Sequence, residues 1–266
     1  MSTRTSSAHN WTLAEDLSLA LAMADAADAI TMDRFGSTSL RIDTKADLTP
    51  VTDADRSTEQ ALRELLGRHR PADAVLGEEF GSTEATNSRQ WILDPIDGTK
   101  NYLRGVPVWA TLIALSLGGA PTVGVVSAPA LARRWWAALG SGAWRSFGTS
   151  APVQIRSSNV ESLAQASFSF SDAIGWPAGQ LERLTTATAR QRAYGDFWSH
   201  MLVAEGSVDI AAEPALGTWD MAALIPIVQE AGGQASGFDG ADPIRAGSLL
   251  TSNRHLHEAV KELLHS

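Results

Sequence analysis

Acidic side chains stand at several points where predicted strands and helices begin or end. They are Asp53, Glu78, Glu79, Asp94, Asp97 and Asp220. Burying several like charges together is unfavourable unless a positive charge lies among them. No basic side chain accompanies each acid in the sequence, so bound cations are the simplest explanation. An all-oxygen ligand set without Cys or His favours Mg²⁺, Mn²⁺ or Ca²⁺ over zinc.

The segment 91–101, Trp-Ile-Leu-Asp-Pro-Ile-Asp-Gly-Thr-Lys-Asn, carries the clearest pattern. We expect a buried strand that ends at Asp94, because Pro95 should stop the strand and set a turn. Asp97 would then return to the same side, and the carbonyl of Ile96 can add a ligand oxygen. The segment therefore predicts a group of oxygen ligands at the end of a buried strand.

The two residues that follow, Gly98 and Thr99, are expected to open a turn or helix whose free N–H groups can hold an anion. Metals beside a phosphate are what hydrolysis of a phosphate ester requires. Taken singly, each acid also fits an ordinary role. Asp220 is equally compatible with a helix N-cap, and Glu79 with a surface position or with a place behind the ligands.

Composition narrows the classes of protein. The chain has 266 residues, of which 44% are hydrophobic and 19% charged, which is enough for a sizeable core and unlike a disordered chain. The formal net charge of −9 disfavours general nucleic-acid binding. The absence of cysteine excludes disulfides, thiolate zinc sites and a cysteine nucleophile. It fits a reducing compartment, so we predict a cytoplasmic protein.

One uncharged stretch, 105–132, is long enough to span a bilayer. Three prolines and the pair Gly118-Gly119 divide it into short pieces. We therefore expect two buried strands, 108–117 and 122–127, joined by a Gly-Gly-Ala-Pro turn, and no membrane association.

Apolar periodicity predicts the elements that must position the acids. We expect helices over 11–34, 52–66, 181–188, 195–205, 220–230 and 256–264, and strands over 74–76 and 91–93 with two or three more before residue 147. Thr52 is a candidate N-cap of the second helix, and Gly67 should close that helix. Pro226 should bend the helix that starts at Asp220. The Gly, Ser, Thr and Pro-rich segment 147–153 suggests an N-terminal half, 1–150, and a C-terminal half, 151–266. The mixture predicts a layered α+β fold.

Other residues have bland interpretations. Arg133-Arg134-Trp135-Trp136 is expected to be an edge strand with its tryptophans packed inward rather than a nucleic-acid contact. The six histidines show no ligand spacing, and His255 and His257, near the C-terminus, are expected to be exposed.

The chain resembles the inositol monophosphatase family of Mg²⁺-dependent, lithium-sensitive phosphatases. The resemblance rests on 91–101, on 77–79 before it, and on 219–220 and 230–233 after it, and it covers most of the chain to about Asn253. The segments 101–109, 127–136 and 192–197 are most similar to the actinobacterial histidinol-phosphate phosphatases of this family. The family fold is an α-β-α-β-α sandwich, usually a homodimer.

The resemblance implies a metal and a water site. The implied ligands of two or three Mg²⁺, with Mn²⁺ as an alternative, are Glu78, Asp94, the Ile96 carbonyl, Asp97 and Asp220. The implied catalytic residues are Asp53, Thr99 and Glu78, with Asp53 and Thr99 orienting and helping to deprotonate the attacking water.

The resemblance also implies a substrate site. The amides of Gly98 and Thr99 would bind the phosphate, and Arg192, Asp196 and Glu213 would contact the leaving alcohol. Lys45, in a loop over 45–52, and Glu79 are further candidates. The segment 216–218 precedes Trp219 where closer relatives tend to carry bulkier residues, so the alcohol pocket is expected to differ from theirs.

Three functions follow, in order of preference. The first is hydrolysis of L-histidinol phosphate to L-histidinol and phosphate, in histidine biosynthesis. The second is the same chemistry on inositol monophosphate, a sugar bisphosphate or adenosine 3′,5′-bisphosphate, because the metal residues hold only the shared phosphate. The third is a catalytically silent metal-binding protein, which the complete set of acids disfavours. The sequence predicts a small phosphate ester as partner and leaves open which ester, the number of metals, the oligomeric state and the effect of Pro226.

Overall fold

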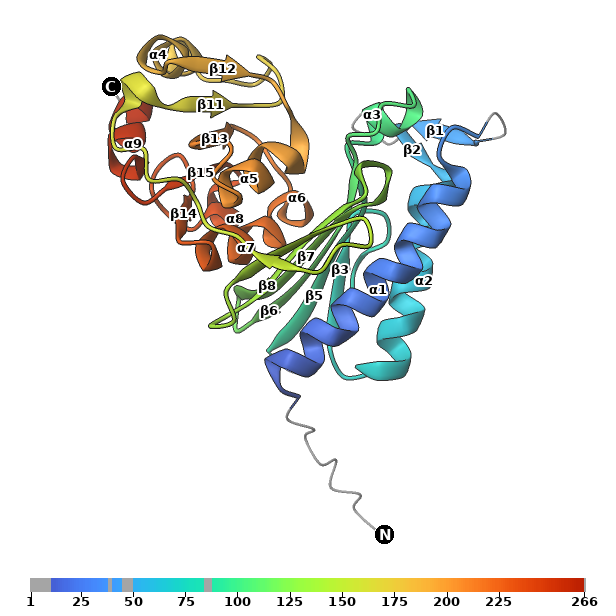
Figure 1. Ribbon diagram of the computed structural model, residues 1–266. Helices are drawn as coiled ribbons and strands as arrows, with labels where there is room; N and C mark the ends of the chain where they lie inside the picture. The colour runs from blue at the N-terminus through green and yellow to red at the C-terminus, as the bar shows by residue number, and fades with distance from the viewer. Residues whose placement is uncertain (1–10, 38–39, 45–49, 84–87, 266) are drawn as a thin grey trace.

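Five alternating layers of helix and sheet form the structure, a computed structural model that describes residues 11–37, 40–44, 50–83 and 88–265 (Figure 1). The first layer holds helices α1 (Leu13–Arg34) and α2 (Asp53–His69). The second is a sheet of eight strands, and the third holds α5 (Asp196–Ala204), α6 (Thr218–Ala222) and α7 (Leu224–Glu230). A sheet of five strands and the outer helices α4 (Gln180–Ala187) and α9 (His257–His265) complete the order. The predicted α-β-α-β-α sandwich is confirmed.

The large sheet positions the predicted ligand segment. Its strands, in the order β10-β9-β8-β7-β6-β5-β3-β4 across the sheet, are β3 (Ala74–Gly77), β4 (Gly81–Ser82), β5 (Arg89–Asp97), β6 (Ala110–Leu117), β7 (Ala120–Ala128), β8 (Arg133–Ala138), β9 (Ala143–Phe147) and β10 (Val153–Gln154). Strands β3 and β5 run parallel, with Gly77 opposite Leu93, and the other neighbouring pairs are antiparallel. The carboxyl ends of β3 and β5 therefore meet at one edge, which brings the residues after each strand together.

The small sheet has the order β12-β11-β13-β15-β14. Its strands are β11 (Ser167–Ser169), β12 (Arg190–Arg192), β13 (Ile210–Glu213), β14 (Gly233–Ser236) and β15 (Leu249–Asn253). The short elements are β1 (Ile42–Thr44), β2 (Pro50–Thr52), α3 (Thr99–Leu103), α8 (Pro243–Ala246) and the 3₁₀ turns Pro129–Leu131 and Leu163–Gln165.

Side chains of β5 alternate between two cores. Trp91 and Leu93 are fully buried in the core beneath α1 and α2, whereas Ile92 packs in the core shared with α5 and α7. Because β5 is covered by apolar side chains on both faces, its sequence over 91–93 is continuously apolar. The core on the α5 side contains residues from both halves of the chain, and β10, which lies after residue 150, still pairs with β9. The division at residue 150 stays a prediction.

Several predicted elements are confirmed. Thr52 caps α2, where its hydroxyl accepts hydrogen bonds from two backbone N–H groups. Strands β6 and β7 are joined by a turn in which Gly118 and Gly119 have φ of 60° and 91°, which favours glycine. Trp135 of β8 is fully buried, although β8 lies inside the sheet and not at its edge. No described helix is long and apolar enough to cross a membrane.

Two predicted strand and helix ends are wrong. Pro95 does not stop the strand, because β3 ends opposite Leu93 and the register with β6 shifts between Asp94 and Asp97, so no ladder hydrogen bond is needed from Pro95. Gly67 does not end α2, which continues to His69. The extension is supported from outside the helix, because the next residue, Arg70, is anchored by a buried ion pair to Asp16 of α1.

Three further predictions need correction. Four strands, β6 to β9, and not two or three, lie between β5 and residue 147. The helix expected over 220–230 is two helices that separate at Ala223, and Pro226 lies in the first turn of α7, where its missing N–H is tolerated. His255 is exposed as expected, but His257 is buried. Its burial is compensated because Ser236 and Ser252 each hydrogen-bond one of its ring nitrogens.

Candidate active site

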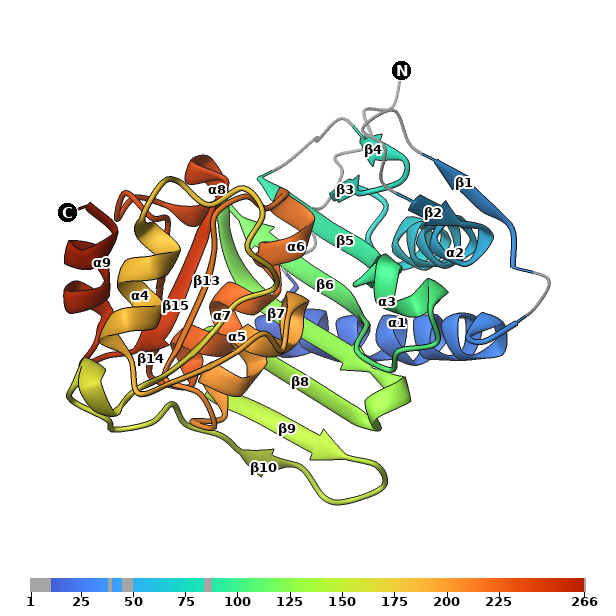
Figure 2. The ribbon, with the colours of Figure 1, turned by 90° about the horizontal axis from the view of Figure 1, so that it is seen from above.

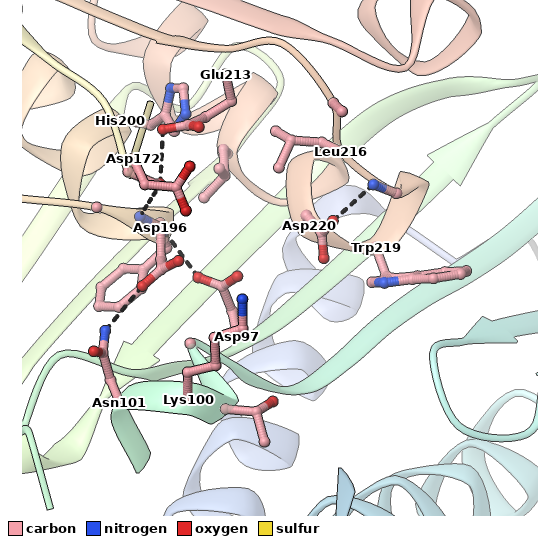
Figure 3. Close-up of a pocket in the computed structure, with 18 of the residues that line it drawn as sticks. Asp97, Lys100, Asn101, Asp172, Asp196, His200, Glu213, Leu216, Trp219 and Asp220 are labelled. Carbon is pink, nitrogen blue, oxygen red and sulfur yellow. Dashed lines mark hydrogen bonds between the residues drawn. The ribbon is translucent and has the colours of Figure 1, made fainter. Parts of the chain in front are cut away.

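Helices α5 and α6 lie over the large sheet (Figure 2). A cavity of about 630 Å³ lies between them and the carboxyl end of β5 (Figure 3). One wall comes from the turn after β5, with Asp97, Gly98 and Thr99. The facing wall comes from the second half of the chain and includes Asp196 and Asp220. The cavity thus joins segments that are at least 97 residues apart in the sequence.

Three of the predicted ligands meet at this cavity. One carboxylate oxygen from each of Asp94, Asp97 and Asp220 lies within 4.8 Å of the others. Strand β5 supplies Asp94 and Asp97 on the two sides of its bulge, and the first turn of α6, which packs against β5, supplies Asp220. The bulge matters because it allows both aspartates of one strand to reach the same place.

Each of the three carboxylates has one oxygen held by a backbone N–H. The donors are Ile96 to Asp94 at 3.0 Å, Phe197 to Asp97 at 2.8 Å and Gly217 to Asp220 at 2.7 Å. Asp220 therefore serves the start of α6 and faces the cluster at the same time. The second oxygen of each carboxylate can be offered to a cation.

The electrostatics of the cluster call for positive charge. Burial, followed by the charges of Glu78, Asp97 and Asp220, raises the pKa of Asp94 well above its ordinary value. Burial and then Asp196 and Asp220 raise the pKa of Asp97 in the same way. Burial raises the pKa of Asp220 to about 6. Within the described residues no Lys or Arg forms an ion pair with Asp94, Asp97 or Asp220, so these carboxylates fit a divalent cation.

The two glutamates after β3 differ. Glu78 lines the cavity, and its N–H donates to the carbonyl of Leu93 at 3.2 Å. The N–H of Glu79 instead donates to the buried carboxylate of Glu59 at 2.7 Å, and Glu79 does not line the cavity. Glu59 also explains Gly77, since a Cβ there would lie 2.0 Å from Glu59 Oε1. The contact of Glu59 with the turn that carries Glu78 could not be predicted from the sequence.

Gly98, in the predicted phosphate-binding turn, has a backbone conformation that favours glycine. Gly98 has φ of +83°, and a Cβ there would lie 2.9 Å from the carbonyl oxygen of Val108. The hydroxyl of Thr99 donates to the carbonyl of Ile96 at 3.0 Å. Asp53 begins α2 and forms an ion pair with Arg34, and no hydrogen bond among the described residues joins Asp53 to Thr99. The expected water-orienting pair is therefore not linked directly in this structure.

A series of hydrogen bonds forms the wall that runs from α3, beside the phosphate turn, to Glu213 at the far side of the cavity. Asn101 Nδ2 donates to Asp196 Oδ2 at 2.9 Å, the Asp196 N–H donates to Ser171 Oγ at 2.7 Å, and the Ser171 hydroxyl donates to Glu213 Oε1 at 2.8 Å (Figure 3). Asp196 has φ of 47°, which is uncommon outside glycine. Burial raises the pKa of Asp196 to about 6 and that of Glu213 to about 7. These hydrogen bonds hold the carboxylates of Asp196 and Glu213 along one side of the cavity.

Not every predicted contact reaches the cavity. Arg192 is exposed on β12, donates to the carbonyl of Gln191 and does not line the cavity. Lys45 lies outside the described residues. Asp172 and His200, which the sequence did not single out, do line it. Asp172 follows a short strand without a motif, and His200 is surrounded by apolar residues of α5, where a histidine is usually part of the core.

Comparison with known proteins identifies relatives of this chain. Residues 12–266 match the Inositol monophosphatase family. The chain is 57% identical over 250 residues to a histidinol-phosphatase of Mycobacterium tuberculosis, covering 92% of this chain and 96% of the relative. It is 52% identical over 254 residues to a histidinol-phosphatase of Streptomyces coelicolor, covering 92% and 95%.

The fold has the same relatives. The solved structure of the extragenic suppressor protein suhB from Bartonella henselae superposes with a TM-score of 0.84 at 27% identity, covering 94% of this chain and 98% of that one. Family match, sequence identity and fold point in one direction: the chain belongs to the inositol monophosphatase family.

Proposed function

We propose that this protein is a Mg²⁺-dependent phosphomonoesterase that hydrolyses L-histidinol phosphate to L-histidinol and phosphate. The observation that carries the proposal is the meeting of Asp94, Asp97 and Asp220 beside the Gly98 turn, in a cavity whose far wall carries further carboxylates. Membership of a family of phosphatases, and the names of the two relatives above 50% identity, support it.

The residues divide into a metal-binding and a phosphate-binding set. Asp94, Asp97, Asp220, Glu78 and the Ile96 carbonyl would hold the cation. When bound, Mg²⁺ supplies a lowered pKa for a water molecule and positive charge beside the phosphate. Two or three ions per site, Mn²⁺ as a substitute and inhibition by lithium belong to the same proposal.

The protein's own groups would orient the reactants. The amides of Gly98 and Thr99, at the start of α3, would hold phosphate oxygens, because peptide N–H groups in this conformation favour anions. The Thr99 hydroxyl would orient the attacking water, and Asp53 would act through a rearrangement of its ion pair with Arg34. Asp196 and Glu213 would hold the leaving alcohol.

The leaving group of the proposed substrate fits the far wall. L-Histidinol carries an ammonium group and an imidazole, and carboxylates attract the first and accept hydrogen bonds from both. Asp172, Asp196 and Glu213 line that side of the cavity, with Lys100 as a basic residue nearer the phosphate turn. A neutral polyol would gain less from this excess of negative charge. We also propose that the enzyme is a cytoplasmic homodimer.

The test is phosphate release from L-histidinol phosphate and from inositol 1-phosphate, each with and without Mg²⁺. We expect Mg²⁺-dependent release from L-histidinol phosphate that exceeds release from inositol 1-phosphate. Equal or greater release from inositol 1-phosphate would show that the substrate is wrong. Release without any metal would show that the mechanism is wrong, and Mg²⁺ binding by calorimetry without turnover of either ester would show a catalytically silent protein.

A further inference from the structure

His200 is a buried polar side chain that the reaction outlined above does not use. It lies in α5, its exposed fraction is 1%, and it lines the cavity together with Asp172 and Glu213 (Figure 3). Its Nδ1 is 2.8 Å from the hydroxyl oxygen of Thr251 on β15. Its Nε2 has no hydrogen-bond partner within the described part of the molecule. One ring nitrogen is thus anchored in the sheet, and the other is buried without a hydrogen-bond partner, in a side chain that lines the cavity.

The anchor determines which nitrogen carries the proton. Thr251 is fully buried, and among the described residues its hydroxyl has no contact other than His200 Nδ1. If the hydroxyl donates to Nδ1, both groups are satisfied and the ring carries its proton on Nε2. If Nδ1 donates instead, the hydroxyl hydrogen is buried without an acceptor, which is unfavourable.

The ring is also neutral at pH 7. Burial lowers the pKa of His200 to about 3, and no charged group contributes to that shift. His200 therefore presents a neutral N–H donor beside the carboxylates of Asp172 and Glu213, which can only accept hydrogen bonds while they are ionised.

We propose that the Nε2–H of His200 donates a hydrogen bond to an acceptor atom of the leaving alcohol and thereby helps to select the substrate. This inference rests on the proposed function, and for L-histidinol phosphate the acceptor is the unprotonated nitrogen of the substrate imidazole. The N–H of the same imidazole can donate to a carboxylate of the cavity wall. His200 and an acid would then hydrogen-bond the two nitrogens of a neutral substrate imidazole.

Two substitutions separate the donor from the anchor. His200→Asn keeps an oxygen that can accept from Thr251 but has no donor at the Nε2 position, whereas His200→Gln can place an amide N–H there. The substrates are L-histidinol phosphate and phenyl phosphate, whose leaving group has no acceptor beyond the ester oxygen. His257→Asn is the matched control, because His257 is equally buried but both of its nitrogens have hydroxyl partners.

We expect His200→Asn to lower the ratio of kcat/KM for L-histidinol phosphate to that for phenyl phosphate by about tenfold, mostly through KM, as for one lost hydrogen bond. His200→Gln should restore most of the ratio, and His257→Asn should leave it unchanged. A ratio that is unchanged in His200→Asn, because both esters lose activity in proportion, would overturn the proposal in favour of a packing role.

A second measurement does not depend on turnover. Nitrogen-15 NMR of the histidine rings at pH 7, assigned by the signals missing from His200→Asn, should find His200 with its proton on Nε2, and added L-histidinol should shift that signal. A proton on Nδ1, or no response to L-histidinol, would overturn the inference. A parent enzyme that hydrolyses phenyl phosphate but not L-histidinol phosphate would instead contradict the proposed function, and the NMR result would then decide the inference separately.

Discussion

Buried acids lie at both ends of strand β5, but their charges are compensated in different ways at the two ends. At its start, Arg89 pairs with Asp16 and Asp73 at 2.9 Å, and Arg70 reaches the same Asp16 at 2.9 Å. Asp16 is fully buried, yet each of its arginine partners brings a positive charge and hydrogen-bond donors. We call Asp16, Asp73, Arg70 and Arg89 the α1 ion-pair network; its two carboxylates are balanced by two guanidinium groups without any ligand.

At the end of β5, Asp94, Asp97 and Asp220 come together with backbone N–H donors but, in the described part of the chain, with no basic partner. We call these three residues the acid cluster. Burial, and then the charges of nearby carboxylates, raise the pKa of each. The comparison teaches that burial alone does not distinguish structural from functional acids. What distinguishes them is whether the protein itself supplies the opposite charge.

The strongest test removes one charge from the acid cluster. Asp94→Asn keeps the volume and one carbonyl oxygen but loses the negative charge that a hard cation requires. We expect turnover to fall on the order of 10³-fold or more. The metal-free protein should be as stable as the parent or slightly more stable, because repulsion with Asp97 and Asp220 is relieved. Activity with Mg²⁺ and the metal-free melting temperature are the measurements.

Near-parental activity of Asp94→Asn, or failure to fold, would place Asp94 with the structural acids and break the comparison.

The same substitution in the α1 ion-pair network should do the reverse. Asp16→Asn leaves Arg70 and Arg89 without the buried charge that they share, so we expect a loss of about 3 kcal/mol in the free energy of unfolding. Turnover per folded molecule should not change. Denaturant titration and activity at low temperature measure the two effects. The control is Asp25→Asn, since Asp25 is 71% exposed in its pair with Arg134, and its loss should stay below about 1 kcal/mol.

Loss of turnover in fully folded Asp16→Asn protein would show that the network also serves the site.

Metal addition sharpens the distinction further. Mg²⁺ at about 100 times its dissociation constant should stabilise the parent by about 2 to 3 kcal/mol, because only the folded chain holds the ligands together. The gain should vanish in Asp94→Asn and persist in Asp16→Asn. Melting temperatures with Mg²⁺ and with a chelator, for all three proteins, measure it. Equal stabilisation of the parent and of Asp94→Asn would mean that Mg²⁺ binds elsewhere.

The smallest expected effect concerns His257, a buried histidine whose two ring nitrogens both have hydrogen-bond partners. Burial, with a smaller contribution from Lys261, lowers the pKa of His257 from 6.5 to about 4. Between these values the unfolded chain binds more protons, so the contribution of His257 to stability is complete above pH 6.5 and is lost as the pH falls towards 4. At pH 5.5 the loss is about 1 kcal/mol.

The measurement is denaturant unfolding at pH 7.5 and pH 5.5. His257→Gln should lose about 1 kcal/mol less than the parent between the two, whereas the exposed His255→Gln should lose as much as the parent. The same pH dependence in parent and His257→Gln would contradict the assigned burial.

Local sequence patterns anticipated much of the fold and the first half of the site. Thr52 as a cap, the Gly118-Gly119 turn and the apolar run before Asp94 are dictated by neighbours in the chain, so they could be predicted. The strand does not end at Pro95 as predicted, because its length depends on its pairing with the neighbouring strands β3 and β6. Pro226 was predicted to bend the helix 220–230, and the helix is instead divided in two at Ala223, within one turn of this proline.

The far wall of the cavity had almost no local signal. Asp172 and His200 carry no motif, and the sequence could not tell that Arg192 would point away while Asn101 would bond to Asp196. These contacts join the two halves of the chain, and their geometry depends on how the third layer of helices lies between the two sheets.

By itself the sequence determined the types of ligand atom, the turn that follows β5 and the layered fold, because these follow from short-range sterics and from the period of apolar residues. Only the tertiary structure decided which acids lie together in one cluster and which form an ion pair with an arginine. Asp16 and Asp94 are both buried at the ends of β5, but Arg70 and Arg89 reach the first and only other acids surround the second. Burial makes both carboxylates need positive charge, and the packing of distant segments decides whether the protein or a bound cation provides it.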